Sequence, residues 1–235
     1  MNGIRLFFRC QKGGVLSALT LFVVLGAVLL ALNYALSQYL YIRRAGAMLE
    51  RAGLSDGWGG SMMGTEFSDI LFGTPRPVDT TANIGVMEKD MVNIIVHGHD
   101  PSLSEMIVMY SQDPEMIALA KSVGAKGINI AGVCCTGNEV AMRQGIPMAG
   151  NFLQQENVVL TGACEAIVVD VQCIFPALGP LSKCFHTKFI TTSPIARMPD
   201  SDFIEFHEDT AADNAKAIIK MAIENFKNRK PELVN

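Results

Sequence analysis

Two patterns of apolar residues divide the chain. Residues 13–42 form an apolar stretch of 30 residues without a single Asp, Glu, Lys or Arg. From residue 92 onward, short runs rich in Val and Ile alternate with longer segments of helical periodicity. The first pattern predicts one long hydrophobic helix, because about 20 apolar residues suffice to cross a bilayer. The second pattern predicts an α/β domain, because alternating strands and helices build a parallel sheet.

The stretch 13–42 is interpreted as an uncleaved membrane anchor. A secretory signal has a shorter apolar region and a cleavage site after small residues, so a signal is an alternative, as is an artefact of a fusion or a misread start. Three tyrosines near the second end fit the bilayer interface: Tyr34, Tyr39 and Tyr41. Three basic residues precede the stretch and three follow it, so the charge bias leaves the orientation open: Arg5, Arg9 and Lys12, then Arg43, Arg44 and Arg51.

The rest of the chain is expected to fold as a doubly wound, Rossmann-like domain. The expected strands are 92–97, 127–133, 166–172 and 188–193. The expected helices are 102–123, 137–144, 152–160, a short one before residue 188, and 208–229. The strands are continuous apolar runs, as expected where helices cover both faces of a parallel sheet. Glycines in 52–65 favour tight turns. We therefore expect an anchor over 1–44, a glycine-rich connection over 45–90 and the α/β domain over 91–235.

Composition excludes two classes of protein. The 235 residues are 49% hydrophobic, enough to bury a core. They carry a formal net charge of −4 and no basic run in the body, so nucleic acid is not an expected partner. Six cysteines are too few for a disulfide-built scaffold. Two of them, Cys134 and Cys135, are adjacent, a spacing that strains a direct bridge. Reduced thiols that serve as ligands are the expected state.

Three short motifs stand where predicted parallel strands end. They are HGH (97–99), GVCCTGNE (132–139) and VQC (171–173). Spacings of 36 and 38 residues separate His99, Cys135 and Cys173, about one strand–helix–strand crossover each. Because parallel strands end at one edge of the sheet, one imidazole and two thiols can converge there. This donor set suits an iron–sulfur cluster, zinc or nickel. The residues alone thus predict a metal or cluster half-site.

Longer motifs identify a family. The segments are DGWGGSMMGTEFSDILFGTPRPV (56–78), VNIIVHGHDP (92–101), GINIAGVCCTGNEVAMRQGIPMAGNFLQQE (127–156), VVDVQC (168–173) and CFHTKFITTSP (184–194). From about Gly53 onward the chain resembles the middle domain of the nickel–iron anaerobic carbon monoxide dehydrogenases. The resemblance implies an oxidoreductase that interconverts CO and CO2 at a nickel–iron–sulfur cluster. It implies that His99 and Cys135 hold the iron outside the cubane and that Cys173 holds the cubane. Cys134 is then a neighbour or an alternative ligand.

The resemblance also implies parts that this sequence does not match. The family's further 4Fe-4S clusters, and the other ligands of the active cluster, belong to flanking domains, so we expect a fragment that is inactive alone. An electron carrier, an acetyl-CoA synthase and a second copy are the implied partners. The expected location is the cytoplasm, with a membrane tether through residues 13–42. Two alternatives stay open: a tethered metal-binding or interaction module without catalysis, and an enzyme resembling the hybrid-cluster hydroxylamine reductases.

Overall fold

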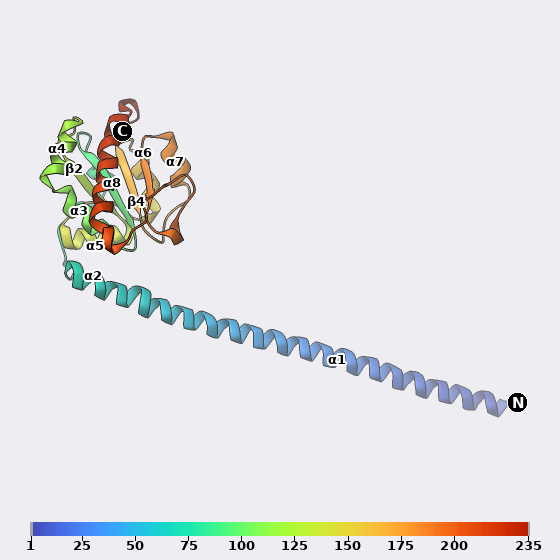
Figure 1. Cartoon of the computed structure of the whole chain (residues 1–235). Coiled ribbons are helices and arrows are strands. Elements are labelled where there is room, and N and C mark those ends of the chain that lie inside the picture. The colour runs from blue at the N-terminus through green and yellow to red at the C-terminus, as the bar shows by residue number, and fades with distance from the viewer. Residues whose placement is uncertain (1, 235) are drawn as a thin grey trace. The chain divides into compact units, whose positions relative to one another are not determined.

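The computed structural model describes residues 2–234, with side chains described for 20–60 and 62–234. By its internal contacts the chain separates into two units, Met1–Thr65 and Glu66–Asn235. The first contains helix α1 (Asn2–Ser55), drawn in blue in Figure 1, and the π-helix η1 (Asp56–Met63). Among the described helices, one is apolar and long enough to cross a membrane by length and composition, and the searched part of it starts at Thr20.

The glycine-rich stretch 52–65 is helical, contrary to the turns that its composition predicts. Helix α1 runs to Ser55, η1 follows it, and α2 (Gly64–Phe72) continues the helical chain. Extending an existing helix adds one hydrogen bond for each residue fixed, whereas a new helix must first form a nucleus. Each glycine lowers helix stability by about 1 kcal/mol, but the long preceding helix removes the cost of nucleation.

The second unit is a doubly wound α/β domain, which confirms the expected fold class. Its six strands form one parallel sheet in the order β3-β2-β1-β4-β5-β6. Their bounds are β1 Val92–Gly98, β2 Ile128–Val133, β3 Met148–Gly150, β4 Cys164–Val169, β5 Lys188–Thr191 and β6 Asp202–Phe203. The order reverses between β1 and β4, and ligands of such sheets bind beyond the strand ends at this switch point.

Helices cover both faces of the sheet (Figure 1). The helices of this unit, besides α2, are α3 Ser102–Ser111, α4 Pro114–Ser122, α5 Cys134–Gln144, α6 Gln155–Leu160, α7 Leu178–Cys184 and α8 Ala211–Asn225. Side chains alternate along a strand, so Ile94 of β1 packs in the core layer that includes α8, whereas Ile95 packs in the layer that includes α6 and α7. Both isoleucines are fully buried.

Three differences from the predicted elements have local causes. The expected helix 102–123 is two helices, because Pro114 starts α4 and the Asp113 side chain caps it by accepting from Glu115 N at 2.9 Å. Strands β3 and β6 are too short to give a periodic signal. Helix α5 starts three residues earlier than predicted, at Cys134, so the adjacent cysteines lie in its first turn.

The expected connecting region 45–90 is divided between the two units, and Ala82 in its later part forms a parallel bridge with Met148 of β3. Arg143 of α5, with a side chain only 2% exposed, bonds Asp69 at 2.9 Å, Glu139 at 3.0 Å and Glu105 at 3.3 Å. Its Nε also donates to the carbonyl of Gly73 at 2.7 Å. Burial raises the pKa of Glu105, against the lowering effect of Gln144 and Arg143. One guanidinium thus holds three carboxylates and the end of α2 together.

Candidate metal centre

Three ligand-bearing loops meet at the carboxyl ends of adjacent strands. His99 follows β1, Cys134 follows β2, and Cys173 lies four residues after β4. The strands end level, because His97 is paired with Val133 of β2 and with Val169 of β4. Parallel pairing therefore brings segments distant in sequence to the switch point of the sheet.

One imidazole and two thiols converge at this edge. A ligand atom of each of His99, Cys134 and Cys173 lies within 4.8 Å of the other two. Two donors of a single tetrahedral metal are about 3.6 Å apart, given metal–ligand bonds of about 2.0–2.3 Å. The three side chains need only small movements to reach that spacing. Nδ1 of His99 is buried and has no hydrogen-bond partner among the described residues, so it is available as a metal ligand.

The structure places Cys134 in this group, whereas the resemblance implies Cys135. Cys134 is buried and Cys135 is exposed, with their Sγ atoms 4.0 Å apart. Placement at a strand end cannot distinguish two adjacent cysteines, because the difference depends on backbone dihedrals. Cys134 has φ +63°, in the left-handed region. Gln172 (φ +61°) and Cys173 (φ +53°) also have left-handed backbone conformations. Both cysteine loops are therefore strained, and surrounding contacts must maintain them.

The surroundings of the inner cysteine, Cys134, keep it as a neutral thiol in the absence of a metal. Burial is the main cause that raises the pKa of the Cys134 thiol to about 12, and the nearby thiols of Cys135 and Cys173 add to it. A thiol must lose its proton to bind a metal, and the metal's charge supplies the stabilisation that burial removes. Cys164 differs, because it lies fully buried within β4 away from this group, as expected for a structural cysteine. Cys184 is an exposed residue at the end of α7.

A buried hydrogen-bond chain supports the Cys173 loop. Nε2 of His97 lies 3.1 Å from Oε1 of Gln155, and burial is the main cause that lowers the pKa of His97. The Gln155 amide donates to the Cys173 carbonyl at 2.9 Å, and Oε1 accepts from Phe175 N at 2.9 Å. Hydrogen bonds through Gln155 thus connect His97 to the Cys173 loop. The sequence did not indicate this role of Gln155, because Gln155 lies in α6, 18 residues before Cys173 in the chain.

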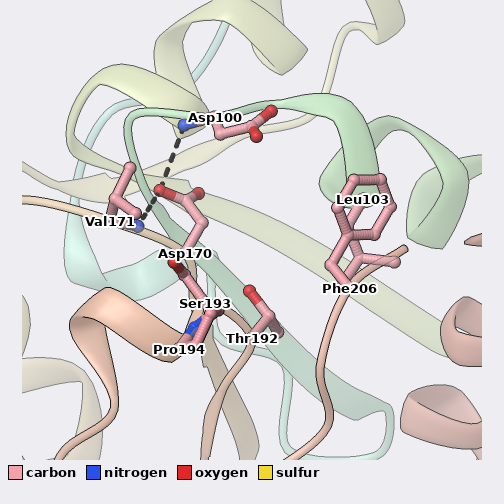
Figure 2. A pocket seen from close by; sticks show the side chains of 8 residues that line it. All are labelled: Asp100, Leu103, Asp170, Val171, Thr192, Ser193, Pro194 and Phe206. Carbon is pink, nitrogen blue, oxygen red and sulfur yellow. Dashed lines mark hydrogen bonds between the residues drawn. The ribbon is translucent and has the colours of Figure 1, made fainter. Parts of the chain in front are cut away.

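Asp170 is a second residue that sequence reasoning missed. It follows β4, is 9% exposed, and borders a cavity of about 110 Å³ whose lining includes Asp100, Thr192 and Phe206 (Figure 2). Burial is the main cause that raises its pKa to about 7, although backbone and Thr136 donors oppose this. Its position inside VVDVQC, directly before a ligand loop, was the only signal in the sequence.

The fold and the donor set define a doubly wound α/β domain with a candidate centre for a soft metal. The His99 imidazole, whose Nδ1 has no partner in the described part of the chain, and two convergent thiols fit iron–sulfur, nickel or zinc chemistry. Residues 40–235 match the model of the Prismane/CO dehydrogenase family. The chain belongs to this family, which confirms the resemblance. Most of the apolar stretch 13–42 precedes the matched residues.

Individual relatives agree with the family match. The chain is 61% identical over 185 residues to carbon monoxide dehydrogenase 1 of Methanosarcina mazei, covering 79% of this chain and 30% of that protein. It is 51% identical over 180 residues to the carbon monoxide dehydrogenase/acetyl-CoA synthase subunit beta of Moorella thermoacetica, covering 77% and 26%. A Ni-free crystal structure of carbon monoxide dehydrogenase from Thermococcus sp. AM4 matches with a TM-score of 0.76 and 53% identity, covering 79% and 29%. The chain thus spans less than a third of the length of these relatives.

Proposed function

We propose that this domain supplies part of the ligand set of a nickel–iron–sulfur cluster in an oxidoreductase that interconverts CO and CO2. The observation that carries the proposal is the convergence of His99, Cys134 and Cys173 at the switch point of the sheet. The proposed reaction follows the names of the relatives, which are carbon monoxide dehydrogenases. These names favour this class of enzyme over the hybrid-cluster hydroxylamine reductases.

In this proposal each residue has a defined task. His99 and one cysteine of the adjacent pair hold the iron outside the cubane, and Cys173 holds the cubane. Cys135 is the pair's ligand by resemblance, whereas Cys134 is the member that the geometry places beside His99. When bound, the cluster supplies the redox chemistry between CO and CO2. The remaining ligands must come from outside this domain, because cubane irons usually take one thiolate each. The proposed protein partners are an electron carrier, an acetyl-CoA synthase and a second copy of the same subunit. Further 4Fe-4S clusters, held outside this domain, are the other proposed cofactors.

Metal loading of cysteine and histidine variants tests this function. We expect the full chain, expressed anaerobically with nickel and iron, to retain iron and acid-labile sulfide through its partial ligand set, although a complete cluster needs the ligands from outside this domain. His99→Ala and Cys173→Ser should each lower the bound metal at least about tenfold, since even residues behind the ligands change metal affinity 10–100-fold. Cys184→Ser is the matched control, because this exposed thiol lies outside the donor group. Metal content that is equal in all four proteins would contradict the assignment.

The same experiment separates the two adjacent cysteines. If Cys134 is the ligand, Cys134→Ser loses metal and Cys135→Ser retains it. The reverse result supports the ligand implied by the resemblance. CO-dependent viologen reduction, measured on each protein, reports whether the loaded chain turns over.

A single zinc ion is the second candidate ligand. Three protein donors plus one water form a common zinc coordination, and three donors converge here. Zinc would give stoichiometric metal without sulfide and without visible absorption. A brown protein with sulfide supports the cluster. In the zinc case the chain would be a metal-binding module without catalysis.

We further propose that residues 13–42 anchor the chain in a membrane, with the α/β domain in the cytoplasm. A helix of 30 uncharged residues is about 45 Å long, enough for the hydrocarbon core and both interfaces. Its described side chains, among them Leu25, Leu29 and Leu32, are exposed, so no core of this unit accounts for their apolar character. Cluster assembly and shelter from oxygen favour the cytoplasm for the domain.

The anchor predicts retention of the protein in membranes after a carbonate wash. Leu25→Arg combined with Leu29→Arg should move most of the protein to the soluble fraction, because each central arginine costs about 2.5–3.5 kcal/mol on insertion. Leu54→Arg, also at an exposed leucine but outside the apolar stretch, is the control and should stay in the pellet. Wild-type protein released by carbonate would contradict the anchor.

A further inference from the structure

We propose that Asp170 is a positioning residue that holds the three ligand-bearing loops in their binding arrangement. This inference rests on the proposed function. Asp170 stands directly after β4, between the ends of β1 and β5 in the sheet order, and its backbone N–H donates to the His97 carbonyl at 3.2 Å. Its carboxylate therefore lies where the loops from neighbouring strands meet.

The Asp170 carboxylate joins its own loop, which leads to Cys173, to the two other ligand-bearing loops. Oδ1 accepts from the backbone N–H of His99 at 2.5 Å and of Asp100 at 3.0 Å, in the loop after β1. Oδ1 also accepts from the N–H of Val171, in the loop that leads to Cys173. Oδ2 accepts from Oγ1 of Thr136 at 2.8 Å, in the helical turn that contains Cys134 and Cys135. Figure 2 shows the bonds to Asp100 and Val171.

The backbone around the carboxylate is built to admit it. Gly98 has φ +129°, and a Cβ at this position would overlap the Asp170 carboxylate. Gly98 also forms an isolated parallel bridge with Cys134, which joins the His99 loop to the cysteine loop. Because Gly98 has no Cβ, the backbone N–H groups of His99 and Asp100 can approach Oδ1 of Asp170 closely.

The arrangement is that of a support and not of a fourth ligand. Both oxygens of Asp170 are already occupied by hydrogen bonds, and the convergent donor group consists of His99, Cys134 and Cys173. The loops it contacts carry the left-handed residues Cys134 and Cys173, conformations that persist only where the surroundings fix them. Residues behind the ligands of metal sites have this task in general.

Binding of Co²⁺ alone to the full chain in detergent tests the inference, followed by thiolate-to-cobalt absorption. Asp170→Ala should weaken Co²⁺ binding about 10–100-fold. Asp170→Asn should bind close to wild type, because its oxygen can accept from the same N–H groups and its amide can donate to Thr136. Asn225→Ala is the control: it removes buried hydrogen bonds to the carbonyls of Glu165 and His186, away from the ligand loops. It should destabilise the domain without changing the affinity of the folded protein.

Hydrogen exchange of the metal-free proteins gives a second readout that needs no metal. Asp170→Ala should speed exchange in 97–101, 134–137 and 171–174 together, and Asn225→Ala should not. Faster exchange only in 171–174, or unchanged exchange and Co²⁺ affinity, would overturn the inference while the proposed function stands. If wild type binds no Co²⁺ but Asp170→Ala loosens all three loops, the positioning role stands and the ligand assignment fails.

Discussion

Replacing Arg229 with methionine should lower the free energy of unfolding of the α/β domain by roughly 3–5 kcal/mol, as for other buried ion pairs that lose one partner. Arg229 Nε and Nη2 donate to the two oxygens of Glu165 at 2.8 and 2.7 Å. The Glu165 side chain is fully buried and that of Arg229 is 9% exposed. Removing the guanidinium leaves the Glu165 carboxylate without its arginine partner, in a buried position where water cannot solvate its charge.

The neighbours of the pair define the controls. Glu165 also accepts from Asn93 N at 2.7 Å and faces His186 Nε2 at 2.9 Å, so glutamine at position 165 keeps the shape and one acceptor but removes the charge. The double variant Arg229→Met, Glu165→Gln should recover a large part of the lost stability. Lys126→Met breaks an exposed pair with Asp90 and should leave the stability almost unchanged, because solvent screens this pair.

The measurement is hydrogen exchange of the β1 and β4 amides in the full chain, which reports the free energy of global opening. A single variant as stable as wild type would show that the buried pair contributes nothing. A double variant no more stable than the single one would show that charge is not the cause of the loss. If the single variant does not fold, recovery in the double variant still tests the argument.

Gly98→Ala should lower the free energy of unfolding by about 2–6 kcal/mol and should disturb the candidate metal centre. A φ of +129° strains any residue with a Cβ by roughly 1–3 kcal/mol, and overpacking adds about 1–3 kcal/mol. The new Cβ would overlap the Asp170 carboxylate, so either the carboxylate or the His99 loop must move. Exchange of the β1 amides measures the stability, and exchange in 97–101 measures the loop.

Gly127→Ala is the matched glycine control. Its Cβ would lie 3.2 Å from the terminal methyl of Met91, a flexible side chain that can shift. We expect a change below about 1 kcal/mol, within the range of substitutions away from special backbone or packing features. Equal stability of the Gly98 and Gly127 variants would contradict the close approach of Gly98 and Asp170.

Much of the fold follows from local patterns in the sequence. The Val- and Ile-rich runs located β1, β2, β4 and β5, because buried parallel strands are apolar on both faces. The apolar runs did not predict β3 and β6. These strands are only a few residues long, and they form because a neighbouring strand pairs with them. The helical course of 52–65 was likewise missed, because its glycines argue against a helix when the long preceding helix is ignored.

The sequence by itself determined the apolar helix, the parallel α/β domain and the meeting of a histidine with cysteines at one edge, because periodicity and strand-end position are local properties. Only the tertiary structure grouped Cys134 with His99 and Cys173 and showed that the Asp170 carboxylate accepts from the His99 N–H. These depend on backbone dihedrals and on hydrogen bonds between residues as much as 71 positions apart in the chain. Such contacts form only when the parallel sheet brings its strand ends together.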